Sequence, residues 1–395
     1  MSRRVIEKLI LLLFGLALPV AMLIGTELVL RTFPALLPPP IRAAPKAPLL
    51  DMFQSDPLRI DDDELVSRFR AGVVMTQTNE LGEIIEFRTA SLGFSDVGFR
   101  DDGLDERKLP RVVVLGDSFA EGANVNLQDG SVELLEQSTG ADFVNLGVGG
   151  YGATQARIVL ERYGLELKPA LVILMFFTGN DLGDDGIYES KTSRSPGDRL
   201  KQFLEKYFYT YELLKHVLGR SSGASSLPLV NEVGSDDLAY RDEELDLVFY
   251  LEHFASLVKD DPPAWIARGM QRTPQSILQI RDICQARGIE FVVVIAPSKE
   301  QVYWEKVASL LAEPDRYDPD GPNRLIKNFA DEHGIAVLDL TPIFRAHADE
   351  QLYFPKDTHW NVAGNRLAAQ AMSDYLLTNG LLTTEHREAE GERHP

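Results

Sequence analysis

From residue 111 onwards, short apolar runs alternate with amphipathic stretches, and this alternation constrains the fold more than any other feature of the chain. The apolar runs are rich in β-branched residues and have the length of buried strands. They cover residues 111–115, 142–146, 170–177, 290–295 and 335–338. Strands that alternate with helices form a parallel sheet covered on both faces. The sequence therefore predicts an α/β fold whose site lies beyond the carboxyl ends of the strands.

The composition permits a sizeable core and excludes one class of partner. Apolar residues make up 44% of the 395 residues, which is enough for one large domain. The net charge of −20 argues against nucleic acid, because phosphate binding needs a basic face. Cys284 is the one cysteine, so no intramolecular disulfide can form, and its apolar surroundings predict a buried thiol.

The amino terminus resembles a membrane anchor. Three basic residues precede an apolar run from Leu9 to about Leu30, which is interrupted near its outer end by Glu27. A run of roughly 20 residues can span a bilayer, and no small-x-small cleavage site follows it. The basic flank favours a cytoplasmic amino terminus. We expect a retained signal anchor with all later residues outside; a cleaved signal peptide is the alternative.

The composition of the rest of the chain indicates further boundaries. A long insertion separates the third and fourth strands, and its aromatic run at 200–218 has two interpretations. It packs its aromatic side chains on the core, or it forms a lid or substrate wall. The expected parts are a signal anchor (1–31), a Pro-rich linker (32–59), an amino-terminal lead-in (60–109), a main domain (110–380) with a helical insertion at about 183–275, and a disordered polar tail (381–395).

A Gly-Asp-Ser turn is the sharpest chemical signal. The segment Val112–Gly122 reads VVVLGDSFAEG, so a buried strand runs into the turn and then into a helix. Ser118 therefore lies at the tip of the first strand, with its backbone N–H near a helix amino terminus. Such an N–H can stabilise an oxyanion. Taken alone, the serine could equally be an ordinary helix cap.

Three further elements follow later strands in the chain. A glycine-rich turn spans 145–152, Asn180 follows the third strand, and His359 with Asp357 precedes the closing helix. Each has an ordinary explanation as a turn or a cap. Together they place a base, an orienting carboxylate and an amide donor at the strand ends where Ser118 lies. The combination predicts a serine nucleophile activated by His359.

These residues resemble the sequence blocks of the SGNH (GDSL) hydrolases over residues 110–378. Ser118, Gly150, Asn180 and His359 match the Ser, Gly, Asn and His that name the family. The resemblance implies a flavodoxin-like three-layer α/β/α fold and hydrolysis or transfer of an acyl ester. It also implies an oxyanion hole formed by the N–H groups of Ser118 and Gly150 and by the Asn180 side chain, with no metal or cofactor.

The chain departs from the family pattern in two places. Phe119 stands where leucine usually follows the serine, which is a harmless apolar exchange. The final block reads Asp357-x-His359-Trp-Asn where the family usually has Asp-x-x-His, which puts the role of Asp357 in doubt. The shorter form is similar to that of bacterial alginate O-acetylation proteins, which are exported and work with membrane acyl carriers. The resemblance implies a periplasmic catalytic domain on a single-pass anchor in the bacterial inner membrane, and a membrane acyl-donor protein as partner.

The function expected is therefore an esterase or O-acyltransferase that acts on acyl esters of carbohydrate. Two alternatives remain, a lipolytic esterase or lysophospholipase and a catalytically idle polysaccharide-binding subunit. The acidic residues that follow Asn180 lack metal-ligand spacing and are interpreted as a solvated loop. The remaining histidines with no partner in the sequence are interpreted as structural or surface residues: His216, His253, His333 and His347.

Overall fold

The computed structural model describes residues 19, 21–42, 46, 48, 56–193, 196–218 and 238–382. Residues 1–18 of the predicted anchor and most of the predicted polar tail lie outside these residues. Among the described helices, none is both long enough and apolar enough to cross a bilayer. The chain divides into two compact units, one made of Met1–Asp56 and Ser193–Ser226, the other of Pro57–Thr192 and Leu227–Pro395.

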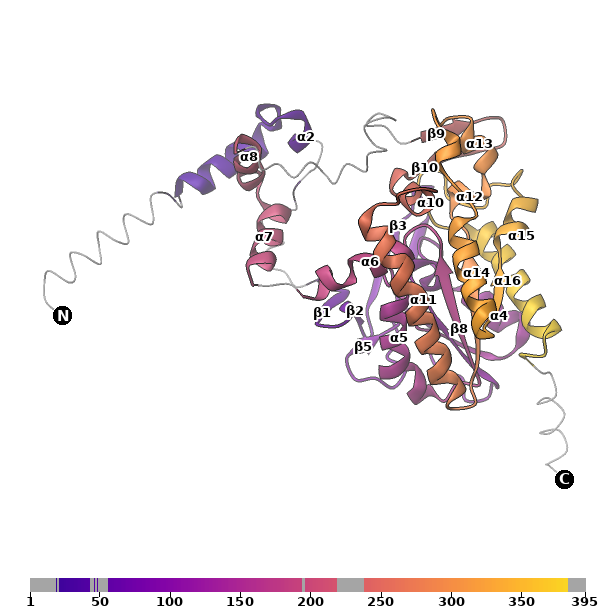
Figure 1. The fold of residues 1–395 in the computed structure, drawn as a ribbon. Helices are drawn as coiled ribbons and strands as arrows, with labels where there is room; N and C mark the ends of the chain where they lie inside the picture. The colour runs from indigo at the N-terminus through magenta and orange to yellow at the C-terminus, as the bar shows by residue number, and fades with distance from the viewer. Residues whose placement is uncertain are drawn as a thin grey trace, which may run out of the picture. The chain divides into compact units, whose positions relative to one another are not determined.

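A five-stranded parallel sheet forms the centre of the larger unit (Figure 1). Its order β12-β11-β8-β6-β7 places the first strand between the second and third, which is the flavodoxin-like arrangement. The predicted α/β fold with a parallel sheet is confirmed. The strands are β6 (Arg111–Leu115), β7 (Asp142–Asn145), β8 (Leu171–Phe177), β11 (Glu290–Ala296) and β12 (Ala336–Asp339).

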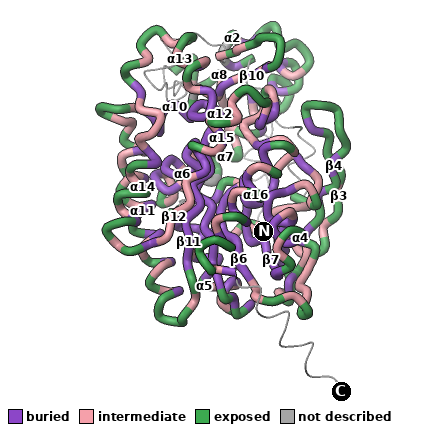
Figure 2. Tube along the Cα trace, turned by 90° about the vertical axis from the view of Figure 1, so that its right-hand side faces the viewer, coloured by how far each residue is buried: buried purple, intermediate pink, exposed green. Residues whose placement is uncertain are grey.

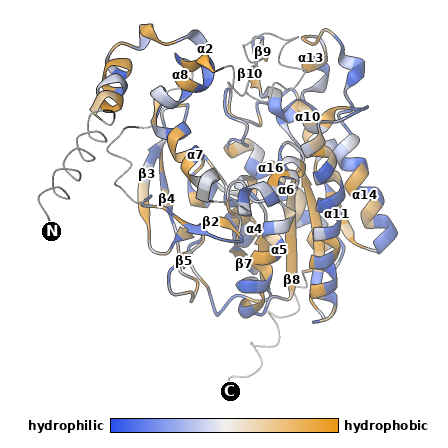
Figure 3. Cartoon of the chain, turned by 60° about the vertical axis from the view of Figure 1, so that its left-hand side comes forward, coloured by the Kyte–Doolittle hydropathy of each residue, from blue (hydrophilic) through white to orange (hydrophobic). Residues whose placement is uncertain are grey.

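The middle strand shows why these runs form the core. All seven residues of β8 are buried, because strands pair with it on both edges and helices cover both faces. Figure 2 shows the buried residues gathered along the sheet. Figure 3 shows β8 as hydrophobic, whereas α11 (Ala264–Gln285) and α14 (Gly321–His333) carry both hydrophobic and hydrophilic residues. Cys284 is fully buried in this core, as the sequence predicts.

The crossover connections distribute the helices over the two faces. Right-handed crossovers put α4, between β6 and β7, on one face and the helices of the later crossovers on the other. The closing helix α16 packs against α4, and α11 packs against both α5 and α6. The helices are α4 (Ser131–Thr139), α5 (Ala153–Arg162), α6 (Asp181–Thr192), α11 (Ala264–Gln285), α14 (Gly321–His333) and α16 (Val362–Thr378).

Short helices lie in the connections of the larger unit. Several begin directly after a strand or a turn of the sheet, at the edge where the site residues lie. They are α3 (Ser118–Glu121), α10 (Phe254–Leu257), α12 (Lys299–Val302), α13 (Trp304–Ala308) and α15 (Thr341–Ala346), with 3-10 turns η3 (Leu127–Asp129), η4 (Gly164–Leu167), η5 (Leu251–His253) and η6 (Pro314–Arg316).

The lead-in before the sheet is made of antiparallel strands. Three of them pair in the order β1-β2-β5, and β3 pairs with β4 as a hairpin. The hydroxyl of Tyr151, in the glycine-rich turn, donates to the carbonyl of Ser67 at 2.6 Å and holds the lead-in to that turn. The strands are β1 (Arg59–Asp62), β2 (Val66–Arg70), β3 (Val74–Thr78), β4 (Ile84–Arg88) and β5 (Val97–Gly98), and a later pair is β9 (Leu238–Arg241) and β10 (Asp246–Phe249).

The smaller unit is helical and has its own apolar cluster. A helix through 21–32 is followed by η1 (Pro34–Leu36) and α2 (Pro39–Arg42), and the unit also holds α7 (Pro196–Tyr207) and α8 (Tyr209–Val217). The cluster consists of Leu30, Leu37, Ile41 and Tyr209.

Buried Glu27 holds the start of α8 in the smaller unit. Its carboxylate accepts hydrogen bonds from the N–H groups of Tyr209 at 3.1 Å and Thr210 at 2.9 Å, and pairs with Arg31. A carboxylate at a helix amino terminus is a favourable cap. Tyr209, in the aromatic run at 200–218, therefore packs in this cluster and not in the core around the sheet.

The segment predicted as an insertion, at about 183–275, includes parts of two helices that cover the sheet. It begins inside α6 and ends inside α11, and these two helices pack against each other over the sheet. The part assigned to the smaller unit is Ser193–Ser226.

Candidate active site

The nucleophile candidate Ser118 begins α3 directly after the turn that ends β6. Gly116 has φ +150°, and a Cβ there would lie 2.8 Å from the carbonyl oxygen of Met175 on the neighbouring strand. Only glycine, which has no Cβ, allows the backbone to come this close to the neighbouring strand. Asp117 then caps α3, since its Oδ1 accepts the Phe119 N–H at 2.9 Å. The glycine and the cap together place Ser118 at the carboxyl edge of the sheet.

The structure brings His359, which lies 241 residues further along the chain, to Ser118, and Asp357 comes with it. Ser118 Oγ lies 2.7 Å from His359 Nε2, and His359 Nδ1 lies 2.5 Å from Asp357 Oδ1. The imidazole is 18% exposed and the carboxylate 30%, so both are shielded, and Ser118 is half-buried. Such a chain can deprotonate a serine hydroxyl and hold the resulting imidazolium.

A tight loop explains how Asp357 and His359 meet with one residue between them. Tyr353 and Trp360 form a β-bridge, and the Phe354 N–H donates to the His359 carbonyl at 3.0 Å. The loop between them turns the Asp357 carboxylate back, so that it accepts both the His359 backbone N–H at 2.9 Å and the ring Nδ1–H. The shorter spacing therefore still places the carboxylate on the ring nitrogen that faces away from Ser118.

Asn124 is a neighbour of this pair that the sequence did not reveal. Burial raises the pKa of Asp357, but hydrogen bonds and charge from His359, with a hydrogen bond from Asn124, lower it to about 2. Asn124 has φ +64°, a backbone region that asparagine tolerates better than most residues. The carboxylate is thus ionised throughout the neutral range and can stabilise a positive imidazole.

Glu80 supports the same loop from the lead-in. It lies in the turn between β3 and β4 and accepts the Lys356 N–H at 3.0 and 2.9 Å through its two carboxylate oxygens. In the same turn, Asn79 donates to the Asn124 carbonyl at 3.3 Å. No sequence motif marks these residues, because their partners lie tens to hundreds of positions away.

The residues predicted to form an oxyanion hole lie at neighbouring strand ends. A Cβ on Gly149 would lie 3.5 Å from the Ser118 Cβ, so the glycine-rich turn adjoins the hydroxyl. Gly150, the next residue, has φ +84°, and a Cβ there would meet nothing within 4 Å. Asn180 follows β8, the strand that pairs with β6.

Three hydrogen-bond donors at these positions are available to a ligand. Within the described part of the chain, the N–H groups of Ser118 and Gly150 and the side-chain Nδ2 of Asn180 have no acceptor, and the buried Oδ1 of Asn180 has no donor. Donors that are directed at a developing oxyanion lower the barrier of acyl transfer. Their assignment to an oxyanion hole stays a prediction.

The acidic residues after Asn180 do not form the solvated loop that the sequence suggested. Asp181, Asp184 and Asp185 lie in the first turns of α6, and Asp181 and Asp185 are buried. Asp181 accepts the Phe177 N–H at 2.9 Å, and Asp185 accepts the Thr154 N–H at 2.9 Å. The interpretation was wrong because these carboxylates satisfy backbone N–H groups of other elements, which the sequence cannot place beside them.

Asp117, next to the nucleophile, is fully buried. Burial raises its pKa to about 7, although the Phe119 N–H and the charge of His359 act in the opposite direction. The unfolded carboxyl releases its proton near 3.8. Between these two pKa values, the folded protein therefore keeps a proton that the unfolded chain has released. The stability that this difference contributes is fully present below about pH 4 and is lost as the pH rises through 7.

We expect Asp117→Asn to reduce the loss of stability between pH 5 and pH 8 by about 2 kcal/mol relative to wild type. The amide keeps an oxygen for the Phe119 N–H but does not ionise. Urea unfolding at pH 5, 6.5 and 8 measures the effect. Asp331→Asn, at an exposed position on α14, is the matched control. Equal pH dependence in Asp117→Asn and wild type would contradict the prediction.

A second imidazole lies close to the site. His253 is buried, with Nδ1 3.1 Å from Glu300 Oε2 and 3.5 Å from the Thr358 hydroxyl. Its ring contacts Phe177 edge-on at 5.6 Å, and Phe177 stacks on Phe119 at 3.9 Å. Its pairing agrees with the predicted structural role.

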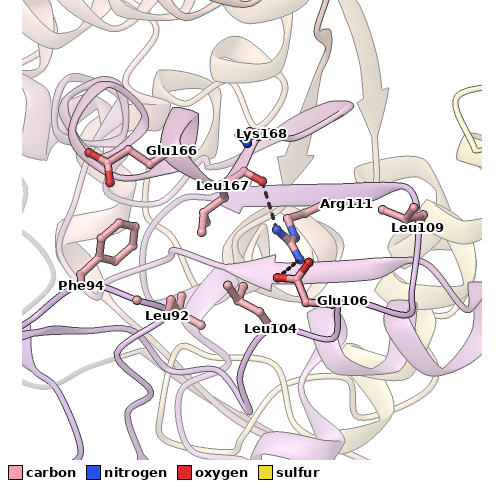
Figure 4. A pocket seen from close by; sticks show the side chains of 10 residues that line it. Leu92, Phe94, Leu104, Glu106, Leu109, Arg111, Glu166, Leu167 and Lys168 are labelled. Carbon is pink, nitrogen blue, oxygen red and sulfur yellow. Dashed lines mark hydrogen bonds and ion pairs between the residues drawn. The ribbon is translucent and has the colours of Figure 1, made fainter.

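A separate cavity of about 450 Å³ is lined in part by Arg111, the first residue of β6 (Figure 4). Ser118 follows the other end of this strand. Leucine and phenylalanine side chains line it, including Leu92 and Phe94. Its charged Arg111 is engaged by Asp142 at 2.5 Å, by the Leu167 carbonyl at 3.2 Å and by Glu106. The cavity contributes nothing to the chemistry at the carboxyl edge.

One carboxylate group among the described residues has a spacing that could hold a cation. Ligand atoms of Asp102, Glu133 and Glu136 lie within 4.8 Å of one another. Glu136 already pairs with Lys108 and accepts the Phe143 N–H at 2.9 Å. The group lies by α4 and is not among the residues around Ser118, so the predicted acyl chemistry does not require it.

A flavodoxin-like sheet with a hydrogen-bonded Ser, His and Asp at its carboxyl edge is an arrangement found in α/β ester hydrolases. The GDSL-like Lipase/Acylhydrolase family model matches residues 114–321, more than half of the chain. The chain belongs to this family, the SGNH hydrolases, and is an enzyme that acts on ester bonds. A second model, for the SGNH hydrolase-like domain of acetyltransferase AlgX, matches residues 258–394.

Two curated relatives are alginate acetylation proteins. The alginate biosynthesis protein AlgX of Azotobacter vinelandii is 27% identical over 141 residues, covering 32% of this chain and 28% of AlgX. The probable alginate O-acetylase AlgJ of Pseudomonas putida is 29% identical over 121 residues, covering 31% of each chain. The chain thus spans less than a third of the length of these relatives.

Solved structures of similar topology are more distant. The acetyl xylan esterase AlAXEase is 13% identical with a TM-score of 0.39, covering 68% of this chain and 100% of its own. A putative G-D-S-L lipolytic protein from Desulfitobacterium hafniense is 16% identical with a TM-score of 0.35, covering 67% and 98%. At these values neither likeness bears on the substrate.

Proposed function

We propose that this enzyme hydrolyses or transfers acetyl esters of carbohydrate through an acyl-enzyme on Ser118. The hydrogen-bond chain from Ser118 through His359 to Asp357 is the observation that carries the proposal. An idle binding subunit has no need of a hydroxyl, an imidazole and a carboxylate held at 2.7 and 2.5 Å. The catalytic domain would lie on the periplasmic side of the bacterial inner membrane, held by the apolar run at its amino terminus.

The proposed reaction begins with His359 Nε2 taking the proton of Ser118 as Oγ attacks the ester carbonyl. The N–H groups of Ser118 and Gly150 and the Asn180 amide receive the oxyanion, and ionised Asp357 stabilises the imidazolium. His359 then gives its proton to the leaving alcohol. Neutral again, it activates water or a sugar hydroxyl, which attacks the acetyl-enzyme and restores Ser118.

The proposal that the acceptor is a carbohydrate rests on the names of the relatives. One relative is a probable alginate O-acetylase, and its similarity supports a sugar hydroxyl as the group that carries or receives acetyl. A membrane acyl-donor protein is the partner that this chemistry, together with an amino-terminal anchor, would need. A lipolytic esterase remains an outcome of the test below.

The test is turnover of p-nitrophenyl esters by the full chain in detergent. We expect acetyl to exceed butyryl and octanoyl in kcat/KM, and added acetyl-free oligosaccharide to divert acetyl from water to sugar. Mass spectrometry of the intact protein should detect one acetyl group on Ser118 before deacylation. A rate that rises with chain length would favour the lipolytic esterase, and an inert protein with no acyl-enzyme would contradict the proposal.

Asn180→Ala should lower kcat for p-nitrophenyl acetate by about 10²–10³, with a smaller change in KM, because an oxyanion donor acts mainly in the transition state. Steady-state kinetics measures both constants. Asn379→Ala, at the exposed end of α16, is the matched control and should leave both near the wild-type values. An unchanged kcat in Asn180→Ala would remove this residue from the oxyanion hole.

A further inference from the structure

Lys299 is a fully buried lysine that the proposed chemistry does not use. It begins α12, directly after β11, and its ammonium reaches the loop that carries Asp357 and His359. Nζ donates to the carbonyls of Val248 at 3.1 Å, Phe354 at 2.7 Å, Pro355 at 3.1 Å and Asp357 at 2.6 Å. An ammonium has three N–H groups, so the four carbonyl oxygens share them.

Three of these carbonyls belong to one tight loop. The bridge between Tyr353 and Trp360 closes the loop, and its turn directs the peptide oxygens of 354, 355 and 357 inward. Buried carbonyls without a donor would cost free energy and would repel each other. The ammonium satisfies the carbonyls of Phe354 and Asp357 at a single point. It shares the Pro355 carbonyl with the Val248 N–H, which donates to it at 2.8 Å.

The carbonyl of Asp357 links Lys299 to the proposed triad. A residue's side chain leaves the same Cα that its carbonyl group leaves, so holding the carbonyl limits where the carboxylate can point. The carbonyl of Asp357 accepts from Lys299 at 2.6 Å, and its carboxylate lies 2.5 Å from His359 Nδ1. A displacement of the Asp357 Cα would disturb both contacts.

The charge of Lys299 is compensated locally. Burial lowers its pKa to about 8, while the negative charges of Glu300, Asp357 and Glu80 raise it. At pH 7 the ammonium is therefore the main form. Hydrogen bonds from a charged donor are stronger than those from a neutral donor, which suits a group that must hold several carbonyls.

We propose that Lys299 is a positioning residue that holds the 354–359 loop in the geometry where Asp357 meets Nδ1 of His359. This inference rests on the proposed function of Ser118, His359 and Asp357 and adds a residue that acts through them. A lysine with a purely structural role would affect stability alone. A positioning lysine also affects the hydrogen bond between Asp357 and His359.

The test compares full-chain Lys299→Met and Lys299→Gln with wild type. Methionine keeps much of the apolar stem and has no donor, whereas glutamine keeps two neutral N–H groups. We expect Lys299→Met to lower kcat about a hundredfold per active site titrated with a fluorophosphonate, with a KM change of less than about threefold. Lys299→Gln should retain more of kcat, and it provides the test if Lys299→Met does not fold.

A spectroscopic readout separates this inference from the proposed function. The strongly hydrogen-bonded Nδ1–H of His359 should give a low-field proton resonance in wild type, assigned by its absence in His359→Gln. Its loss or upfield shift in Lys299→Met supports positioning even if wild type turns over no ester, a result that would count against the proposed function alone. Lys327→Met, whose side chain is 48% exposed, is the matched control.

The opposite result is equally clear. If folded Lys299→Met or Lys299→Gln has a lower melting temperature but unchanged kcat per titrated site and an unmoved His359 resonance, Lys299 is merely structural. The positioning role is then excluded.

Discussion

Ser118→Ala should lower kcat for p-nitrophenyl acetate by about 10⁴–10⁶, down to the level left by binding and oxyanion stabilisation. Ser118 Oγ lies 2.7 Å from His359 Nε2, so its hydroxyl is the group placed to become the nucleophile. Alanine removes one oxygen at a half-buried position and should leave the fold intact. Steady-state kinetics, with circular dichroism to verify folding, measures the effect.

Ser309→Ala is the matched control for that variant. Ser309 is exposed after α13 and donates only to the carbonyl of Lys306, so its replacement should leave kcat at the wild-type value. Ser118→Ala should also fail to accumulate an acetyl-enzyme. Turnover that persists in Ser118→Ala above one per cent of wild type would mean that another group attacks the ester.

His359→Ala is expected to have an effect of similar size, about 10⁴–10⁶ on kcat, because the base and the nucleophile act as a unit. For the same reason, Ser118→Ala combined with His359→Ala should be no slower than either single variant. Asp357→Asn should cost less, about 10⁴, since it leaves the base in place but removes the charge that stabilises the imidazolium. The same p-nitrophenyl acetate assay ranks the variants.

His347→Ala serves as the control for the imidazole. His347 is 45% exposed and pairs with Glu350 at the surface, so its loss should not change kcat. A double variant much slower than either single variant would indicate that Ser118 and His359 act in separate steps. Restoration of His359→Ala by added imidazole would further support its role as base.

The strands and the site residues could be predicted because each leaves a local pattern. The run 111–115 matches β6 at both ends. The strands β7, β8 and β11 differ from their predicted runs by one residue at one end, and β12 differs by one residue at each end. Parallel strands end at a common edge, so motifs that follow separate strands must meet there. That rule predicts that Ser118, Asn180 and the glycine-rich turn adjoin one another.

The supporting residues could not be predicted in this way. Lys299 reads as an ordinary charged residue in the sequence, yet it is fully buried among carbonyls from two other segments. The sequence suggests that Asp181 and Asp185 are solvated, yet both are buried and accept hydrogen bonds from backbone N–H groups. A polar side chain gives no local signal of which distant backbone groups it will satisfy, because that depends on where other segments cross it.

The sequence alone thus determined the parallel α/β fold and the chemical identity of the proposed triad, since both follow from residue type and order along the chain. The tertiary structure decided the geometry that makes the triad usable. It placed Asp357 on His359 Nδ1 through a tight loop, and it gathered Asn124, Glu80 and Lys299 around that loop. Hydrogen bonds depend on distances of a few tenths of an ångström, which only the packed chain defines.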